Sequence, residues 1–373
     1  METKKLGLGM MRLPQTDAND AKSVDMPQVC RMVDAFLAKG FTYFDTAYMY
    51  HDFISEEVVR EALVKRYPRD SFTLATKMPT MFLKKEKDHE RIFSEQLQKC
   101  GVDYFDYYLI HSLSTEHYEV AQRLDTFGYV AGLKERGLIR QMGFSFHDTA
   151  DVLERILSDH PEVDFVQLQV NYLDWDNDGI QSRRCLEVAR AHHKPVIVME
   201  PVKGGSLAKV PPQVEALYRS IHPDMSVASW ALRFAASQED VMMVLSGMSS
   251  MEQLEDNMSF MADFKPLDAE EYQAIAKAVE IINGTIAIPC TACRYCTDGC
   301  PRQIDIPQFF ALYNADKQSV NQGFSIQQSY YETYIHNHAR ASDCIGCGKC
   351  EEICPQHLPI RQYLKDVAKA FEG

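Results

Sequence analysis

A cysteine pattern occurs twice near the C-terminal end of the chain and constrains the fold more than any other feature. The first copy runs from Cys290 to Pro301 and the second from Cys344 to Pro355, and both read C-x2-C-x2-C-x3-C-P. This spacing brings three thiols onto one tight loop, while the fourth cysteine, followed by proline, binds the other centre when two are present. We therefore expect two [4Fe-4S] clusters. The expected ligands are Cys290, Cys293, Cys296 and Cys354 for one cluster, and Cys344, Cys347, Cys350 and Cys300 for the other.

Zinc and disulfides are the alternatives for these cysteines. A single C-x2-C pair suits zinc, but four cysteines in each copy, the closing proline and the repetition favour clusters. Disulfides are typical of secreted chains, and no apolar signal segment opens this sequence. The repeat resembles the bacterial two-cluster ferredoxin module. This resemblance covers residues 281–373 and implies a small α+β iron-sulfur domain.

Length and charge limit the remaining classes. A chain of 373 residues suits a large barrel with a smaller domain attached. A formal net charge of −14 argues against binding to nucleic acid or to an anionic membrane surface. The sequence has no uninterrupted apolar run of about eighteen residues, so we expect no membrane span. The three other cysteines, Cys30, Cys100 and Cys185, are scattered as in a reducing cytoplasm.

Residues 1–280 alternate short β-rich runs with longer segments of helical periodicity, which is typical of a parallel sheet built from βα units. Eight such units predict a (β/α)8 TIM barrel over residues 1–280, followed by the iron-sulfur domain over residues 281–373. A doubly wound sheet is the competing fold, but no G-x-G-x-x-G follows the first strand. The expected strands are Leu6–Met11, Thr42–Asp45, Phe72–Thr76, Phe105–Ile110, Gln141–Phe144, Phe165–Gln169, Val196–Met199 and Met242–Leu245.

Polar residues close several of these strands, at the end of the barrel where TIM-barrel enzymes place their chemistry. Asp45, Lys77 and His111 end the second, third and fourth strands, and Tyr50 follows Asp45 closely. Each residue alone could be a satisfied polar group or part of the packing. An acid, an amine, an imidazole and a phenol at one mouth together favour a catalytic site.

Several segments around these residues resemble the aldo-keto reductase superfamily, in family order and spacing over nearly all of residues 5–260. The resembling segments are Leu6–Pro14, Phe44–Ala47 with Tyr50, Thr76–Lys77, Leu109–His111, Gly137–Arg140, Gly143–Ser145 and Gln169–Tyr172. The resemblance implies reversible reduction of a carbonyl by hydride from a nicotinamide. It also implies a catalytic tetrad of Asp45, Tyr50, Lys77 and His111.

In this tetrad Tyr50 would protonate the carbonyl oxygen as charge develops there. A free phenol has a pKa near 10, and we expect the nearby Lys77 ammonium to lower it. Asp45 would hold Lys77 in place and keep it charged. His111 would orient the substrate oxygen, with a tautomer that the sequence does not specify.

The resemblance also implies contacts to the nicotinamide dinucleotide. The expected cofactor-binding residues are Ser145 and Gln169 for the carboxamide, Gly204, Gly205 and Leu207 for the pyrophosphate, and Asp256 and Asn257 for the adenine. Phe146 stands where the family has an asparagine, so that contact is lost or comes from His147. Gly247 and Gln253 stand where NADPH-dependent relatives have a lysine and an arginine. No cation remains there for a 2′-phosphate, so NADH becomes a credible cofactor beside the family's default, NADPH.

The expected nicotinamide and the expected clusters transfer different numbers of electrons. A hydride carries two electrons, whereas each [4Fe-4S] cluster carries one. A bound flavin would reconcile them, although no flavin motif is readable. We expect an oxidoreductase that acts on a small-molecule carbonyl substrate and exchanges electrons through its clusters with a redox partner protein or a bound cofactor. The alternative is that the clusters are a structural or docking module on a plain carbonyl reductase or a non-catalytic subunit.

Overall fold

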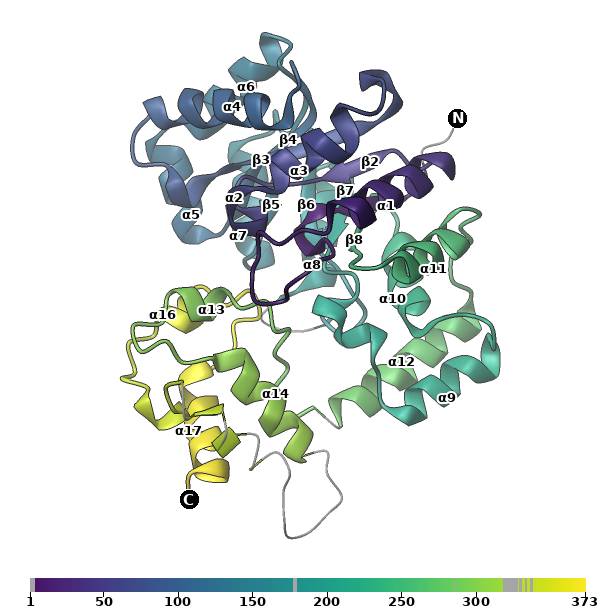
Figure 1. Ribbon diagram of the computed structural model, residues 1–373, viewed down its shortest axis with the longest axis vertical. Helices are drawn as coiled ribbons and strands as arrows, with labels where there is room; N and C mark the ends of the chain where they lie inside the picture. The colour runs from purple at the N-terminus through teal and green to yellow at the C-terminus, as the bar shows by residue number, and fades with distance from the viewer. Residues whose placement is uncertain are drawn as a thin grey trace. The chain divides into compact units, whose positions relative to one another are not determined.

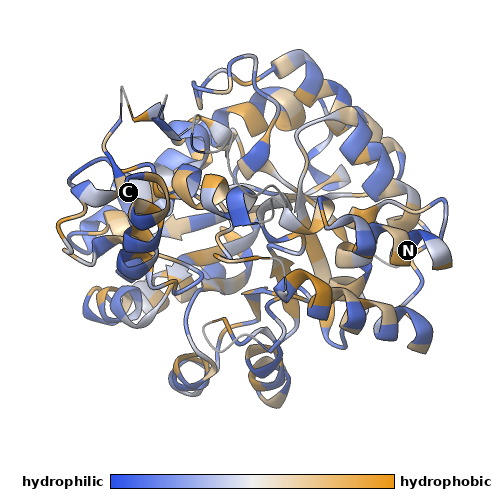
Figure 2. Cartoon of the chain, turned by 90° about the horizontal axis from the view of Figure 1, so that it is seen from below, coloured by the Kyte–Doolittle hydropathy of each residue, from blue (hydrophilic) through white to orange (hydrophobic). Residues whose placement is uncertain are grey.

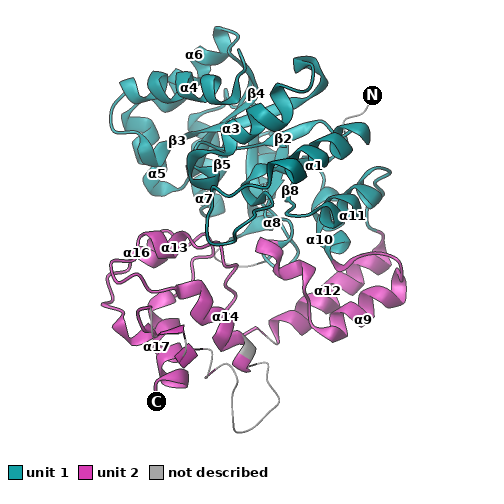
Figure 3. Ribbon diagram, viewed as in Figure 1, with its two compact units in different colours: residues 1–202, 228–267 teal, residues 203–227, 268–373 magenta. Residues whose placement is uncertain are grey.

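The computed structural model describes residues 4–176, 180–284, 286–317, 328, 331–332, 334–335 and 338–373. The chain forms two compact units (Figure 3). The first contains Met1–Val202 and Ala228–Leu267, and the second contains Lys203–Val227 and Asp268–Gly373.

The first unit is a closed barrel of eight parallel strands in sequential order, which confirms the predicted (β/α)8 fold (Figure 1). Four strands are longer than predicted: β3 and β4 each run three residues further at their C-terminal ends, and β5 and β8 extend at both ends. The first strand ends early, at Gly9, because Met10–Arg12 turns into a 3-10 helix. The strands are β1 Leu6–Gly9, β2 Tyr43–Asp45, β3 Thr73–Pro79, β4 Phe105–Leu113, β5 Ile139–Phe146, β6 Phe165–Gln169, β7 Val196–Met199 and β8 Val241–Gly247.

Helices connect these strands and surround the barrel. Local signals set several of their ends: the Asp25 side chain accepts from the backbone N–H of Gln28 at the start of α1, and Gly101 ends α4 with a left-handed φ of 70°. A short α-helix, α3 Ser55–Val59, is followed directly by a π-helical segment, η2 Arg60–Val64. The helices are α1 Met26–Ala38, α2 Tyr50–Phe53, α3 Ser55–Val59, α4 Lys87–Cys100, α5 Thr115–Arg123, α6 Thr126–Glu135, α7 Ala150–Asp159, α8 Ser182–Ala191, α10 Val227–Ala236 and α11 Met251–Met261.

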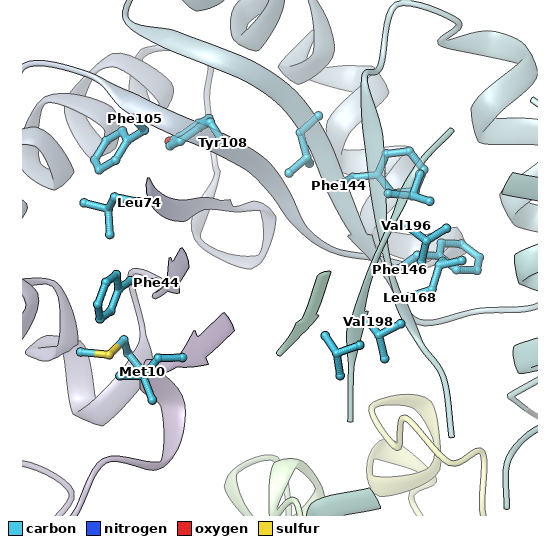
Figure 4. Close-up of a cluster of buried hydrophobic side chains, with 14 of the residues drawn as sticks. Met10, Phe44, Leu74, Phe105, Tyr108, Phe144, Phe146, Leu168, Val196 and Val198 are labelled. Atoms are coloured by element: carbon cyan, nitrogen blue, oxygen red, sulfur yellow. The ribbon is translucent and has the colours of Figure 1, made fainter. Parts of the chain in front are cut away.

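The barrel has two buried layers. The larger layer packs strands against helices, and Figure 4 shows members such as Phe44, Leu74 and Phe144. The barrel strands are mostly hydrophobic in Figure 2, whereas the helices mix hydrophobic and hydrophilic residues. The smaller layer fills the barrel, where the Tyr107 ring contacts those of Tyr43 and Phe165 from non-neighbouring strands. This inner layer consists of Tyr43, Ala75, Leu109, Phe165, Ile197, Met243 and Leu245.

Along each strand, the inward-facing positions continue from this inner layer to the mouth of the barrel. Side chains of a strand alternate between its two faces. Tyr43, Ala75 and Leu109 point inward, so the inward positions two residues later are Asp45, Lys77 and His111. The fold therefore aims the three predicted polar residues at one place.

The second unit is helical in its described residues. Helix α12 starts at a capping box in which Asp268 and Glu271 accept from each other's backbone N–H. An α+β domain was expected, but the described residues from 281 onward contain no strand. The cysteine loops use left-handed backbone at Ala292, Arg294 and Gly346, which leaves little extended chain for pairing. The helices are α9 Pro212–Ile221, α12 Ala269–Asn283, α13 Tyr295–Asp298, α14 Ile306–Lys317, α16 Lys349–Glu352 and α17 Ile360–Phe371.

Across the described ranges of both units, every helix is too short or too polar to cross a lipid bilayer.

Candidate active site and cluster sites

A buried ion pair joins β2 to β3 at the C-terminal end of the barrel. The Lys77 ammonium donates to Asp45 Oδ1 at 2.5 Å and to the Thr46 carbonyl at 2.8 Å. Only 1% of Lys77 and 3% of Asp45 is exposed. Burial alone shifts both pKa values toward the neutral forms, raising that of Asp45 and lowering that of Lys77. The short contact and the additional hydrogen bonds oppose this shift and favour the charged pair.

Tyr50 lies beside this pair, at the start of α2. Lys77 Nζ donates to the phenol oxygen of Tyr50 at 3.3 Å. The next two residues, His51 and Asp52, have left-handed backbone with φ near 50°. Such strain persists only where contacts hold it, and here the backbone N–H of Leu13 donates to His51 Nε2 at 3.2 Å. The Tyr50 ring is thereby held 6.1 Å, centroid to centroid, from that of His111.

The phenol of Tyr50 is protonated at neutral pH, because its pKa is raised. Burial raises its pKa well above 10, the negative charges of Asp45 and Glu200 raise it further, and Arg12 opposes them. The net shift of this pKa is therefore upward, opposite to the lowering predicted from Lys77. Burial is the largest cause, and Lys77 is paired with Asp45 at 2.5 Å, closer than the 3.3 Å between Lys77 and the phenol oxygen.

His111 faces the same mouth as a neutral imidazole. Burial lowers its pKa well below 6.5, and the positive charge of Lys77 lowers it further. Its ring makes no hydrogen bond within the part of the chain that the structure describes, and Nδ1 is buried without a partner. A buried polar atom without a partner is costly, so the site suits a ligand oxygen that the ring can bind.

The predicted carboxamide contacts are ordered by neighbouring polar groups. Ser145 Oγ accepts from the backbone N–H of Ser112 at 2.8 Å. The amide nitrogen of Gln169 donates to the buried Asp174 carboxylate at 3.0 Å, and Asn171 donates to the same carboxylate at 2.7 Å. The Gln169 amide oxygen bonds no other described residue, so the amide is held with its acceptor available. These residues fit a nicotinamide carboxamide. Phe146 packs outward against Phe144 and takes no part.

The sequence interpretation missed two polar residues at the mouth. The amide nitrogen of Gln167 donates to Asp45 Oδ2 at 3.3 Å across the barrel. Strand alternation could have revealed it, because Gln167 lies between the inward residues Phe165 and Gln169. Arg12 is the second, since a Cβ built on Gly247 would lie 3.2 Å from its side chain. Arg12, in the 3-10 helix that follows β1, thus places a cation beside Gly247, where the sequence interpretation expected none.

The predicted adenine contacts lie on α11. Asn257 is buried, and its amide donates to Ser246 Oγ at 2.9 Å, which fastens α11 to the end of β8. The Asp256 side chain is half-buried on the same helix. Ser250 caps the N-terminus of α11 by accepting from the backbone N–H of Gln253. The position of Gln253 is therefore well defined, in the first turn of the helix.

In the second unit, the eight motif cysteines gather around two cavities in the predicted sets. The first cavity is lined by Cys290, Cys293, Cys296 and Cys354, and the second by Cys300, Cys344, Cys347 and Cys350. The two cavities have similar empty volumes, about 310 and 320 Å³. Ile306 lines both cavities. Burial raises the pKa of the Cys290 and Cys350 thiols to about 11, so thiolates there need a bound metal centre.

The predicted pyrophosphate residues also belong to the second unit. Gly204 has a φ of +64°, and a Cβ built on it would lie 2.4 Å from the carbonyl oxygen of Thr291. Gly205 has a φ of +101° with open space around it, and Leu207 is buried. The structure thus packs Gly204 against the wall of the first cavity and leaves Gly205 uncovered.

Comparison with known proteins assigns both parts of the chain. Residues 5–280 match the model of the aldo/keto reductase family, and residues 289–359 match that of the 4Fe-4S dicluster domain. The chain belongs to the aldo/keto reductase family. This aldo/keto reductase is an oxidoreductase with a C-terminal 4Fe-4S domain, as its sequence predicted.

Relatives of this aldo/keto reductase match it over most of the barrel. An uncharacterized oxidoreductase of Schizosaccharomyces pombe is 25% identical over 268 residues, which are 69% of this chain and 81% of the relative. The NADH-specific methylglyoxal reductase of Escherichia coli is 25% identical over 298 residues, 68% of this chain and 89% of the relative. The crystal structure of an aldo-keto reductase from Klebsiella pneumoniae in complex with NADPH shares the fold, with a TM-score of 0.56 and 23% identity over 75% of this chain and 91% of that chain.

Proposed function

We propose that this aldo/keto reductase reduces the carbonyl group of a small molecule at the C-terminal end of the barrel, or oxidises the corresponding alcohol. A nicotinamide dinucleotide would supply or accept the hydride. The observation that carries the proposal is the contact of one buried ammonium, that of Lys77, with both Asp45 and the Tyr50 phenol. The mouth of the barrel thus holds together an acid, Tyr50, a cation, Lys77, and a carboxylate, Asp45, that positions the cation.

Each side chain of the tetrad has a role in this proposal. The protonated Tyr50 donates its proton to the substrate oxygen as negative charge develops there, and neutral His111 hydrogen-bonds the same oxygen and orients it. Lys77 stabilises the phenolate that remains after the transfer, and Asp45 holds Lys77 in position. General acid catalysis of this kind contributes about 10²- to 10⁴-fold to the rate.

The cofactor contacts belong to the same proposal. Ser145 and Gln169 would bind the carboxamide, Gly204, Gly205 and Leu207 the pyrophosphate, and Asp256 and Asn257 the adenine. A bound NADPH in the Klebsiella pneumoniae structure and the NADH-specific activity in the name of the Escherichia coli relative support a nicotinamide, without favouring one form. A flavin is a further candidate as the agent between two-electron and one-electron transfer.

For the second domain, taken as residues 281–373 after a barrel of residues 1–280, we propose two [4Fe-4S] clusters that exchange electrons with a redox partner protein or a bound cofactor. Two cavities of similar size, each lined by four cysteines, support the number of clusters. The alternative role, a structural or docking module, would leave the clusters out of the electron path.

An anaerobic titration of the purified protein with NADH and with NADPH tests the coupling. Nicotinamide absorbance and cluster absorbance are followed together, and bound flavin is assayed after denaturation. We expect the clusters to bleach as reduced nicotinamide is consumed. Turnover of a model aldehyde with clusters that stay oxidised would contradict electron exchange and leave the docking alternative.

The variant Tyr50→Phe completes this experiment. It keeps the ring but removes the proton, so carbonyl reduction should fall by about 10²-fold or more while nicotinamide binding stays unchanged. Cluster bleaching that persists in Tyr50→Phe would mean that electrons reach the clusters without the tetrad. Unchanged aldehyde reduction in this variant would contradict the catalytic role of Tyr50.

A further inference from the structure

Lys203 is a buried cation at the first cavity of the second unit. Only 3% of Lys203 is exposed, and its ammonium donates to the Gln356 side-chain oxygen at 2.7 Å. Gln356 lines the first cavity and follows the ligand Cys354 by two residues. The long side chain of Lys203 therefore ends at the wall of the proposed cluster site.

The neighbouring glycine fixes the same segment to the other ligand loop. Gly204 packs against the Thr291 carbonyl so closely that a Cβ would lie 2.4 Å from that oxygen. Thr291 lies between Cys290 and Cys293 and also lines the first cavity. Lys203 itself has a left-handed φ of 48°, which a residue with a side chain adopts only when its surroundings enforce it. Two successive residues are thus locked to both sides of one cavity.

The cations that line the second cavity are placed differently. Half of the Arg361 side chain is exposed, and its guanidinium lies 2.7 Å from the Glu351 carboxylate. Arg302 is equally exposed. Solvent screens the charges of Arg361 and Arg302, and the paired carboxylate offsets that of Arg361. The buried ammonium of Lys203 is screened far less.

We propose that Lys203 raises the reduction potential of the cluster bound by Cys290, Cys293, Cys296 and Cys354, relative to the other cluster. The inference rests on the proposed function, because it requires that both cavities hold clusters. Reduction adds one electron, and so one negative charge, to a cluster. A buried ammonium at the wall of the first cavity stabilises that added charge. An electron shared between the clusters then rests mainly on the first one.

The test is an anaerobic potentiometric titration with dithionite as reductant, with each reduced cluster followed by electron paramagnetic resonance. In Lys203→Gln we expect one of the two one-electron steps to move to lower potential by at least tenfold in its equilibrium constant, about 59 mV. Lys203→Arg keeps the charge and should stay within half of that shift. Arg361→Gln is the matched control at the second cavity and should move neither step by tenfold.

A second variant covers the case in which Lys203→Gln fails to assemble. Gln356→Glu adds a negative charge on the same wall and should lower the same step. Unchanged potentials in protein with full iron content, in whichever of Lys203→Gln and Gln356→Glu assembles, would overturn the role of Lys203. Iron content separates this failure from that of the proposed function, since two clusters require about eight iron atoms per wild-type chain. A wild-type chain without them would contradict the cluster assignment itself.

Discussion

The Lys77 ammonium lies 3.3 Å from the phenol oxygen of Tyr50, yet the pKa of that phenol is raised. Two charged side chains from loops far apart in the sequence shift this pKa in opposite directions. Glu200 raises the pKa of Tyr50 and Arg12 lowers it, and the two lie 3.9 Å apart, both partly exposed. The pKa of Tyr50, the acid of the proposed mechanism, therefore depends on a second ion pair, Arg12–Glu200, in addition to Lys77–Asp45.

This arrangement predicts opposite pH effects for two charge-removing variants. In Glu200→Gln the pKa of Tyr50 falls, so the alkaline limb of the pH profile, where carbonyl reduction loses activity, should move to lower pH. In Arg12→Gln the pKa rises, and the alkaline limb should move to higher pH. Because both side chains are partly exposed, each displacement should be under about one pH unit. The measurement is kcat/KM against pH, and displacement of both limbs in the same direction would contradict the assignment.

Cofactor preference gives a prediction for Gln253, in the first turn of α11. Its side-chain oxygen accepts from the backbone N–H of Ser249 at 2.8 Å, and it carries no charge for a 2′-phosphate. Gln253→Arg should tighten NADPH binding about tenfold or more, since a hydrogen bond between charged groups contributes about 1.5–3 kcal/mol. NADH lacks the 2′-phosphate and is the internal control. Fluorescence titration measures both affinities, and equal changes for the two nucleotides would place residue 253 away from the 2′-phosphate.

Much of this architecture was predictable because it rests on periodic patterns. Eight alternating βα units predict the closed barrel, and alternation along each strand aims Asp45, Lys77 and His111 inward. The cysteine motif likewise predicts the two ligand sets, because its spacing is itself the geometry of a cluster loop. In each of these cases the sequence distance determines the spatial relationship.

The remaining features depend on segments that are far apart in sequence. Gln167 reaches Asp45 across 122 residues; alternation along β6 turns it inward, but which side chain it meets there depends on how the barrel closes. Arg12 reaches Gly247 only because β1 pairs with β8 when the barrel closes. The pair Gly204 and Gly205 suited a phosphate loop in the sequence, whereas the structure shows one of them packed on a backbone carbonyl. A glycine looks the same in a sequence whether it admits a ligand or a neighbouring chain.

A buried acid on α3 predicts a pH dependence of stability. Glu56 is fully buried; it accepts from the Thr76 hydroxyl at 2.7 Å and the Gln96 amide at 2.8 Å, while its second oxygen has no partner among the described residues. Burial raises its pKa from 4.5 to about 6. The folded protein therefore binds this proton more tightly than the unfolded chain does. The resulting stability, about 2 kcal/mol, is present below pH 4.5 and is lost as the pH rises through about 6.

Glu56→Gln removes this titration. The difference in free energy of unfolding between wild type and variant should change by about 2 kcal/mol between pH 4.5 and 7.5, in favour of the variant at the higher pH. Urea unfolding of the holoprotein at both pH values measures it. Glu57→Gln, at the exposed neighbouring position, is the control and should show no such change. A pH-independent difference for Glu56→Gln would mean that Glu56 stays ionised in the fold.

The barrel interior predicts a packing defect at Gly143 on β5. A Cβ built there would lie 2.5 Å from the ring of Phe165, which fills the barrel beside Tyr107. Gly143→Ala should therefore destabilise the protein by about 1–3 kcal/mol. Gly132→Ala is the matched control, because Gly132 lies inside α6 with nothing within 4 Å of its Cβ position. That exchange should stabilise by about 0.5–1 kcal/mol. Equal effects in thermal unfolding would contradict the tight contact.

The two adjacent glycines after β7 give a sharper test of the cluster site. In Gly204→Ala the new Cβ would meet the Thr291 carbonyl at 2.4 Å, so the loop between Cys290 and Cys293 must move. We expect the purified variant to lose about half of its iron, the share of one cluster. Gly205→Ala adds only backbone strain of about 1–2 kcal/mol, because its Cβ position is open, and should keep its iron.

Iron and acid-labile sulfide analysis distinguishes these outcomes in the anaerobically purified proteins. Electron paramagnetic resonance of the dithionite-reduced Gly204→Ala should retain one cluster signal, which is the one that Lys203→Gln leaves unmoved. Retention of all iron with an unaltered spectrum would mean that the Thr291 loop yields without disturbing its ligands. Loss of both clusters would instead mean that the two cavities, which share Ile306 in their walls, form a single cooperative unit.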